Sequence, residues 1–560
     1  MVKRFIKVLN TEWNGLHEAA FLLGIFALLS QVLALVRDRL LASQFGAGAT
    51  LDAYYSAFRI PDFLYASIAS LVAITVLIPF LVEKISQDET RRKARVFLSS
   101  IFSVFLATIT IVCLGIAILL PRLAPFVVPG FDPETTETFL SLTRLLLLSP
   151  VLFGLSNLLG VVTQTYRKFF VFAIGPVLYN LGIILGIVVF SPTYGVKGVA
   201  FGVLIGACLH LLVQVPVVLR ERLMPRVTFR LAWADIQSVI ALSLPRTLGL
   251  ASGHIAMLVL VAIASYLSHG SIAIFTLAMN MQSIPLSTIG MSYSVAAFPT
   301  LVALHVKGRR KDFLLEVSTA ARHIIFWSFP AIVLFVVLRA QVVRTILGSG
   351  LFDWTATRLT AAALAIFALS VLAQSLNLLF VRAYYAMGNT RTPLVVNVTS
   401  ALGIVLCGFM LIWAFDHLLV FRYFLEAILR VEDLPGTDVL MLPLAYSLGM
   451  LANMTLYLIM FRKDFPEFLH ILKRTVLHSF TASILMGYVA YHGLQVFERF
   501  LNTDTTLGIF LQGAISGACG IIALVFVLRL MDNREVLEIG RSLRRRFWKA
   551  RPIVEATEGL

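Results

Sequence analysis

Charged residues interrupt two of the longest apolar stretches of this sequence. The first stretch continues the apolar run at residues 19–29, and its charged residues are Arg37, Asp38 and Arg39. The second stretch covers residues 52–82, and its charged residues are Asp52, Arg59 and Asp62. A charged side chain in the middle of a bilayer costs about 2.5–3.5 kcal/mol on the mildest scale, so such residues usually face a cavity or pair with one another. Several of them within two spans predict a polar chamber inside the membrane, which favours transport.

The second stretch places its polar residues on one side. Asp52, Tyr55, Arg59 and Asp62 are spaced by three, four and three positions, which is the spacing of one helical face. This pattern predicts a polar stripe that lines a cavity. The alternative is structural, with Asp52 at a helix start and an ion pair between Arg59 and Asp62.

The first stretch offers a cation and two further polar groups. Gln31 and Asp38 are seven positions apart and share a face, and Arg37 lies about 100° further round the helix. Arg37 either contacts an anionic substrate or neutralises an acid of the second stretch. Arg246, directly after Pro245 in a later apolar stretch, is a second candidate for a phosphate ligand, or else extends its side chain to the membrane surface.

The composition independently indicates a membrane protein. The chain has 560 residues, of which 59% are hydrophobic and 14% charged, and its mean hydropathy is +0.89. A soluble domain carries about 25% charged residues. The net charge of +16 lies in short segments between apolar runs, which is typical of cytoplasmic loops rather than of a nucleic-acid-binding surface. We therefore expect no nucleic-acid partner.

Motifs of soluble enzymes and metal sites are missing from the sequence. It contains neither a His-Glu-x-x-His pair nor a Gly-x-x-x-x-Gly-Lys phosphate loop. Its cysteines all lie in apolar stretches without paired spacing, at Cys113, Cys208, Cys407 and Cys519. We expect no catalysis, no cofactor and no bound metal.

The apolar stretches predict an all-α polytopic membrane protein. About 20 apolar residues are needed for a helix to cross the hydrocarbon core. Fourteen stretches meet this length: 18–43, 52–82, 96–120, 138–165, 169–190, 197–219, 235–266, 271–303, 322–346, 356–386, 392–415, 438–461, 472–495 and 506–530. With the N-terminus inside, 32 Lys and Arg residues fall on the cytoplasmic side and 8 outside. This asymmetry predicts that both termini are cytoplasmic.

An internal repeat is visible at a shift of about 220 residues. Residues 42–48 resemble residues 264–270, and Pro79 is matched by Pro299, although so few identities also arise by chance. Two six-helix repeats of even span number run in the same orientation, an arrangement that places a substrate site between the halves. The predicted parts are an N-terminal lobe (1–219), a cytoplasmic linker (220–234), a C-terminal lobe (235–461), two additional helices (462–530) and a basic cytoplasmic tail (531–560).

Two peripheral segments are amphipathic. Residues 534–551 place Val536, Ile539, Leu543 and Phe547 on one side of a helix and most of the basic residues elsewhere, which predicts a helix lying on anionic membrane lipids. Residues 417–432 have a similar apolar face and are expected at the outer membrane surface. We expect the protein to be a monomer.

Four successive motifs resemble one known family. Val36-Arg37-Asp38-Arg39, Phe45-Gly46-Ala47-Gly48, Asp52-Ala53-Tyr54-Tyr55 and Ala57-Phe58-Arg59-Ile60-Pro61-Asp62 follow one another as in the MurJ/MviN lipid II flippases of the MOP exporter superfamily. The resemblance extends over all fourteen predicted spans. It implies movement of an undecaprenyl-diphosphate-linked peptidoglycan precursor from the inner to the outer leaflet of the bacterial cytoplasmic membrane by alternating access, through a basic central cavity.

The resemblance also implies site residues. Arg37 is expected to be the main diphosphate ligand, with Arg59 oriented by Asp62, since Arg presents a planar fork to phosphate oxygens. Gln31 and Asn280 stand where the family carries further cavity arginines, so Arg246 is a possible substitute. Asp38 and Asp52 complete the predicted substrate-binding set.

Three other functions remain open from the sequence. The first two are a flippase for another lipid-linked oligosaccharide and a MOP-type antiporter. The third is a membrane scaffold that does not transport, although scaffolding requires no intramembrane Arg and Asp pair.

Overall fold

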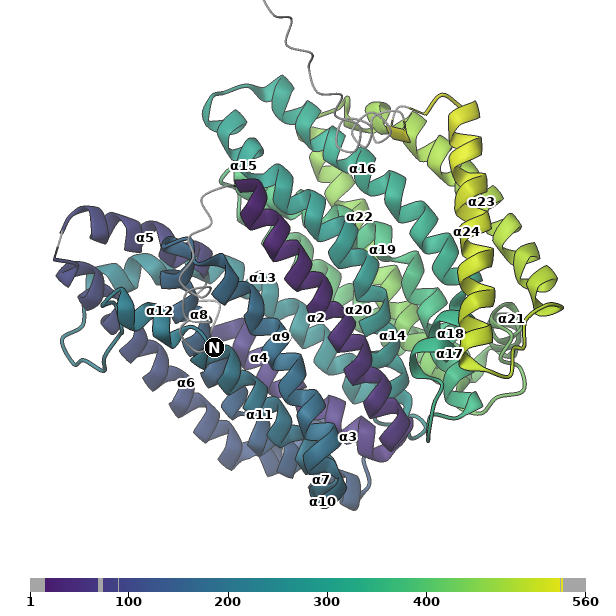
Figure 1. Ribbon diagram of the computed structural model, residues 1–560, viewed down its shortest axis with the longest axis horizontal. Helices are drawn as coiled ribbons and strands as arrows, with labels where there is room; N and C mark the ends of the chain where they lie inside the picture. The colour runs from purple at the N-terminus through teal and green to yellow at the C-terminus, as the bar shows by residue number, and fades with distance from the viewer. Residues whose placement is uncertain (1–15, 69–73, 89, 534, 537–560) are drawn as a thin grey trace, which may run out of the picture. The chain divides into compact units, whose positions relative to one another are not determined.

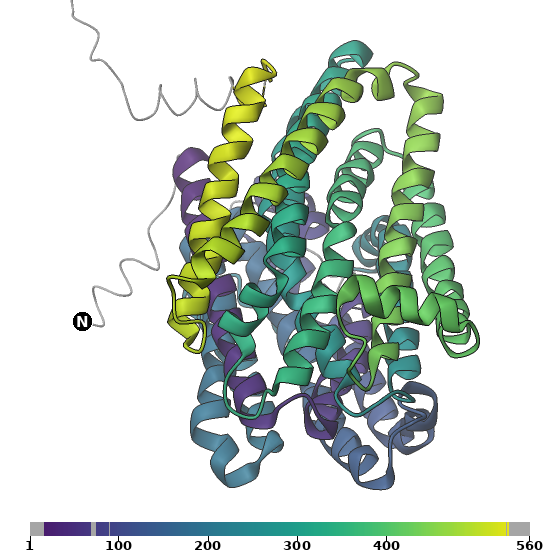
Figure 2. The same cartoon turned by 90° about the vertical axis from the view of Figure 1, so that its right-hand side faces the viewer.

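Every secondary-structure element in the described part of the chain is a helix (Figures 1 and 2). The computed structural model describes residues 16–68, 74–88, 90–533 and 535–536. Contacts divide the chain into two compact units. The first comprises Met1–Ile284, Val343–Ser370 and Gly388–Leu456, and the second comprises Pro285–Val342, Val371–Met387 and Tyr457–Leu560. The predicted lobes rest on the sequence repeat instead, and they stay a prediction.

The first unit contains most of the helices. They are α2 (Leu16–Phe45), α3 (Ala49–Ala57), α4 (Arg59–Ile68), α5 (Ile74–Ser86), α6 (Arg92–Val127), α7 (Pro133–Leu146), α8 (Leu148–Thr165), α9 (Phe169–Leu185), η2 (Gly186–Phe190), α10 (Ser191–Tyr194), α11 (Val196–Leu212), α12 (Val215–Arg220), α13 (Trp233–Ala264), α18 (Trp354–Leu369), α20 (Arg391–His417), α21 (Leu419–Leu429) and η4 (Thr437–Leu440).

The second unit is built from fewer and longer helices. They are η3 (Leu286–Met291), α15 (Ser292–Val306), α16 (Arg310–Val337), α19 (Val371–Ala386), α23 (Phe468–Glu498) and α24 (Thr506–Leu530). Three helices cross from one unit to the other, namely α14 (Ser271–Pro285), α17 (Arg339–Leu347) and α22 (Met441–Asp464).

Ten helical segments in the described residues are long and apolar enough to cross a membrane, or eleven if α18 and α19 form one span. The polytopic all-α fold is therefore confirmed, but the count of fourteen is not. The other three predicted spans correspond to α2, to α3–α5 and to α23. In α2 the side chains are described only from Leu22 onward, and that part contains Arg37, Asp38 and Arg39. Residues 69–73 within the second stretch lie outside the described residues, and α23 carries Lys473, Arg474 and three histidines.

Glycines allow α9 and α11 to pack at backbone distance. A Cβ added to Gly182 would lie 2.4 Å from the Cα of Gly206, and one added to Gly202 would lie 2.6 Å from the carbonyl oxygen of Gly182. Glycines four positions apart form such close contacts in membrane helices because they remove the side chain that would separate the backbones. Helix α9 consequently packs closely against α11, and α2 packs against α9.

The connection between α12 and α13 is fixed to the start of α6. Hydroxyl oxygens of Ser99, Ser100 and Ser103 accept hydrogen bonds from backbone N–H groups at residues 226, 232 and 228. Arg91 forms an ion pair with Glu221 at 3.1 Å. The predicted linker is therefore an ordered segment of the first unit.

The two predicted peripheral segments differ in what the structure describes. Within residues 417–432, helix α21 exposes large apolar side chains on one face, including Val420 and Phe424, while Glu426 on the other is buried and accepts from Arg422 and Thr437. This segment is amphipathic as predicted. In the predicted tail helix 534–551, only residues 535 and 536 are described, so the tail prediction lies outside the described residues.

Candidate functional site

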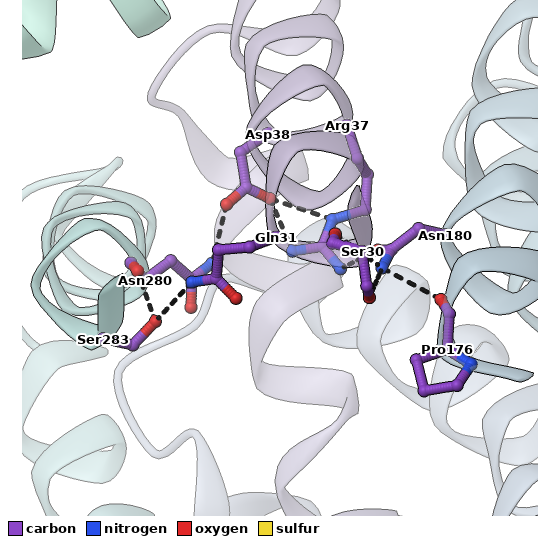
Figure 3. Close-up of polar contacts among 8 residues, drawn as sticks. All are labelled: Ser30, Gln31, Arg37, Asp38, Pro176, Asn180, Asn280 and Ser283. Atoms are coloured by element: carbon purple, nitrogen blue, oxygen red, sulfur yellow. Dashed lines mark hydrogen bonds and ion pairs between the residues drawn. The ribbon is translucent and has the colours of Figure 1, made fainter. Parts of the chain in front are cut away.

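An ion pair between neighbouring residues forms the centre of the candidate site. The Nε and Nη2 groups of Arg37 both donate to Oδ1 of Asp38, at 2.9 and 2.8 Å (Figure 3). Consecutive side chains of a helix point in different directions, so the long guanidinium side chain bends back to reach its neighbour. The Arg37 side chain is 19% exposed and that of Asp38 only 4%. Asp38 is thus the buried half of the pair.

Two asparagines from other helices complete this polar cluster. Asn180 of α9 accepts from Nη1 of Arg37 at 3.1 Å and donates to the hydroxyl of Ser30 at 3.1 Å. Asn280 of α14 donates to the second carboxylate oxygen of Asp38 at 3.0 Å. The cluster therefore joins α2, α9 and α14 through hydrogen bonds (Figure 3).

Gln31 lies beside the same cluster. Its amide donates to the hydroxyl of Ser283 at 3.5 Å, and Ser283 donates to the backbone carbonyl of Asn280 at 2.6 Å. Four predicted site residues, Gln31, Arg37, Asp38 and Asn280, are thus brought together. Sequence reasoning gave no role to Asn180 or Ser283, although an amide in the middle of an apolar helix is a signal for Asn180.

Arg39 has a different role from Arg37. Its Nη1 group donates to the carbonyl oxygens of Thr345 at 2.5 Å and of Ile346 at 3.3 Å, at the C-terminal end of α17. A cation at this position satisfies orphan carbonyls and opposes the negative end of the helix dipole. Arg39 accordingly anchors a helix end.

The buried carboxylate of Asp52 caps a helix distant in sequence. It accepts hydrogen bonds from the backbone N–H groups of Gly270 at 2.6 Å and Ala273 at 2.8 Å. These groups are among the orphan donors at the start of α14. The structural alternative placed Asp52 at a helix start, and Asp52 does stand in the first turn of its own helix α3. Its carboxylate, however, caps the start of α14.

Arg59 also faces α14. Its Nη2 group donates to the hydroxyl of Thr276 at 3.0 Å. Among the described residues no direct ion pair joins Arg59 to Asp62, although their charges interact electrostatically, so the orientation of Arg59 by Asp62 stays a prediction. The Nε of Arg59 and the hydroxyl of Tyr55 are buried and have no hydrogen-bond partner within the described chain. Two residues of the stripe, Asp52 and Arg59, thus bond to α14, and the stripe keeps two buried polar groups without a hydrogen bond in the described chain.

Arg246 lies in α13, but its side chain is outside the described residues. The structure consequently gives no position for the predicted substitute cation. The described cluster contains one arginine and one aspartate in direct contact, with neutral amides around them.

The family model and the curated relatives that match this chain point to the same family. The sequence model of the family described as "Lipid II flippase MurJ" matches residues 41–511. The chain is 27% identical over 413 residues to the probable lipid II flippase MurJ of Bdellovibrio bacteriovorus, covering 70% of this chain and 77% of that protein. It is 25% identical over 389 residues to the lipid II flippase MurJ of Burkholderia cenocepacia, covering 68% and 75%.

Solved structures share the fold. A lipid II flippase MurJ in an inward closed conformation matches with a TM-score of 0.72 and 21% identity, over 92% of this chain and 100% of that chain. An inward-facing multidrug resistance MATE transporter of the MOP superfamily matches with a TM-score of 0.62 and 16% identity, over 79% and 96%. The apolar helices and the bacterial relatives indicate a multi-pass protein of the bacterial inner membrane. Because the family match covers most of its length, the chain belongs to the MurJ family of lipid II flippases, which are transporters and not enzymes.

Proposed function

We propose that this protein moves lipid II, a polyprenyl-diphosphate-linked peptidoglycan precursor, from the inner to the outer leaflet by alternating access. Membership of the MurJ family supports the substrate class, and the ion pair of the partly exposed Arg37 with the buried Asp38 is the observation that carries the mechanism. The protein acts as a monomer with both termini in the cytoplasm, and its basic tail rests on anionic lipids.

Arg37 is the diphosphate ligand in this proposal. Its guanidinium has five N–H donors, of which three are used by Asp38 and Asn180. It is also the more exposed member of the pair. A diphosphate carries more charge and more acceptor oxygens than one carboxylate, so it competes with Asp38 for the guanidinium. When Arg37 turns to the substrate, Asn280 retains its hydrogen bond to Asp38 and limits the cost of leaving that carboxylate buried.

The unused groups of the second stretch give a further contact position. Arg59 keeps one buried N–H without a partner in the described chain, and Tyr55 keeps a hydroxyl. Unsatisfied buried polar groups are costly, so a substrate that bonds to them gains that energy on arrival. Arg59 and Tyr55 are therefore assigned to the substrate pathway. Asp62 and Arg246 are assigned to it from their positions in the sequence alone.

Asp52 is assigned to the conformational step. Its carboxylate ties α3 to the start of α14 through two backbone hydrogen bonds. Helices at the two ends of an alternating-access cycle must separate on one side and close on the other. The Asp52 contact is one that has to break and form during that cycle.

A depletion and replacement experiment tests the proposed function. A bacterium depleted of its own lipid II flippase accumulates the precursor in the inner leaflet, and expression of this chain should restore its delivery and growth. Arg144→Ala, at an exposed position of α7, serves as a control and should also restore growth. If the unaltered chain is correctly inserted but does not deliver lipid II, and instead delivers another lipid-linked sugar, the alternative flippase is favoured. Export of an organic cation without lipid delivery would favour the antiporter, and neither activity would favour the scaffold.

A further inference from the structure

A small polar pocket lies in the second unit, outside the site described above. Its volume is about 130 Å³, and its polar lining consists of Arg322, Arg474, Thr475, His478, Asn533 and Glu535. Arg322 belongs to α16, the next three residues belong to α23, and the last two follow α24. Helix α23 packs against both α16 and α24, and the pocket lies between the middle of α16, the first turns of α23 and the residues that follow α24.

The acid in this pocket is already occupied. Glu535 has a side chain that is 4% exposed, accepts a hydrogen bond from the hydroxyl of Thr475 at 2.8 Å, and lies 3.9 Å from Nη1 of Arg322. The carboxylate therefore holds the chain after α24 against α23 and balances one positive charge. The charge of the second cation that lines the pocket, Arg474, is not balanced by this carboxylate.

Several nitrogen groups of the lining remain unused. The Nε of Arg322 and the Nδ1 of His478 are buried without a hydrogen-bond partner in the described part of the chain. Arg474 is exposed and has neither an ion pair nor a hydrogen bond to any described residue. A pocket with surplus positive charge and unused nitrogen donors favours an anion rich in acceptor oxygens.

The size of the pocket limits what such an anion can be. A water molecule takes about 30 Å³ of liquid volume, whereas pockets for drug-sized ligands measure about 300–1,000 Å³. The 130 Å³ available here accommodate a tetrahedral oxyanion with a few waters, and because the pocket is partly open, the rest of a larger ligand can lie outside it. We propose that this pocket binds a phosphate group through Arg322, Arg474 and His478.

The position of the pocket favours the phosphate of a membrane lipid over free phosphate. Arg322 and Arg474 stand at the beginning of the predicted spans 322–346 and 472–495, where the basic residues place the cytoplasmic membrane surface. On α23 the neighbouring side chains Val476, Leu477 and Phe480 are exposed, with Leu477 59% exposed. A lipid whose phosphate occupies the pocket can place its acyl chains along this apolar face. The proposal does not depend on lipid II flipping.

Binding measurements on the purified full-length chain in a neutral detergent test this site. The probes are dihexanoylphosphatidylglycerol, the phosphate-free dihexanoylglycerol, and inorganic phosphate, each titrated while bound probe is measured by native mass spectrometry. Arg474→Gln removes the cation at the exposed edge and leaves the Arg322–Glu535 pair intact. Lys473→Gln removes an equal charge from the adjacent exposed residue, which does not line the pocket.

We expect the phosphatidylglycerol probe to bind the unaltered chain, and Arg474→Gln to raise its Kd about tenfold or more because a charge-assisted contact is lost. His478→Gln should weaken binding less, and Lys473→Gln should leave it unchanged. If inorganic phosphate binds as tightly as the lipid and shows the same variant pattern, the phosphate site stands and its source is free phosphate. Three results would each overturn the proposal. The first is that dihexanoylglycerol binds as tightly as the phosphatidylglycerol probe, and the second is that Arg474→Gln and Lys473→Gln weaken binding equally. The third is that neither phosphate probe binds.

Discussion

Replacement of Arg37 separates a substrate ligand from a structural ion pair. Arg37→Ala removes three hydrogen bonds and leaves Asp38 buried with Asn280 as its remaining partner in the cluster. Removing one member of a buried ion pair costs about 3–5 kcal/mol, because an uncompensated charge stays inside. The single variant should therefore be destabilised as well as inactive, and its inactivity alone would not identify a ligand.

A double variant resolves the two effects. Arg37→Ala with Asp38→Asn leaves no stranded charge, and the new amide can still accept from Asn280. We expect this protein to recover most of the lost thermal stability in detergent. If Arg37 binds the diphosphate, flipping should stay lost, because one charge-assisted contact is worth about 1.5–3 kcal/mol, or roughly a ten- to hundredfold loss in affinity. Arg37→Lys should retain partial activity, since a point charge cannot reproduce the planar fork.

The assays are thermal unfolding of purified protein and restoration of lipid II delivery in the depleted bacterium. If the double variant is inserted and stable and flips lipid II at the rate of the unaltered protein, the ligand role of Arg37 is refuted and the pair is purely structural. An unchanged unfolding temperature for Arg37→Ala alone would refute the argument from the buried Asp38 carboxylate.

Three further predictions concern packing, capping and topology. Gly202→Val should lower the unfolding temperature strongly, because its Cβ would lie 2.6 Å from a carbonyl oxygen of α9, whereas Gly115→Ala, with nothing within 4 Å, should have little effect on the same measurement. Asp52→Ala should destabilise the protein by about 1–3 kcal/mol in chemical unfolding, since it leaves buried N–H groups of α14 unpaired, and Asp52→Asn should lose less; equal losses would contradict capping by the carboxylate charge. A cysteine at residue Asn502 should react with an impermeant reagent from outside, and one at Lys307 only after permeabilisation; the reverse labelling would overturn the orientation.

The class of the protein follows from the sequence alone. A stretch of about 20 apolar residues must satisfy its backbone groups internally in lipid, and a helix does so with bonds between near neighbours in the chain. This local rule explains why the helices occur where the apolar stretches predict them. It is also why the polar residues of the first two stretches identify a site: their cost inside the bilayer does not depend on knowing their partners.

The partners themselves were decided by tertiary structure. Arg37 and Arg39 have the same charge and stand two positions apart, yet one joins Asp38 and Asn180 and the other binds carbonyl groups at the end of α17. Two positions correspond to about 200° around a helix, so the two side chains meet different neighbours. The spacing predicts that they differ, but only the packing of α9 and α17 determines what each one binds.

Long-range contacts explain the remaining differences. Asp52 caps α14 through Gly270, 218 residues further along the chain, and the spacing of its own stretch contains no trace of that helix start. Asn180 was recognisable as a polar residue in an apolar run, but its bond to Arg37 depends on the close approach of α2 and α9. Periodicity reports which face of a helix a residue occupies, whereas the helix opposite that face is chosen by packing over the whole unit.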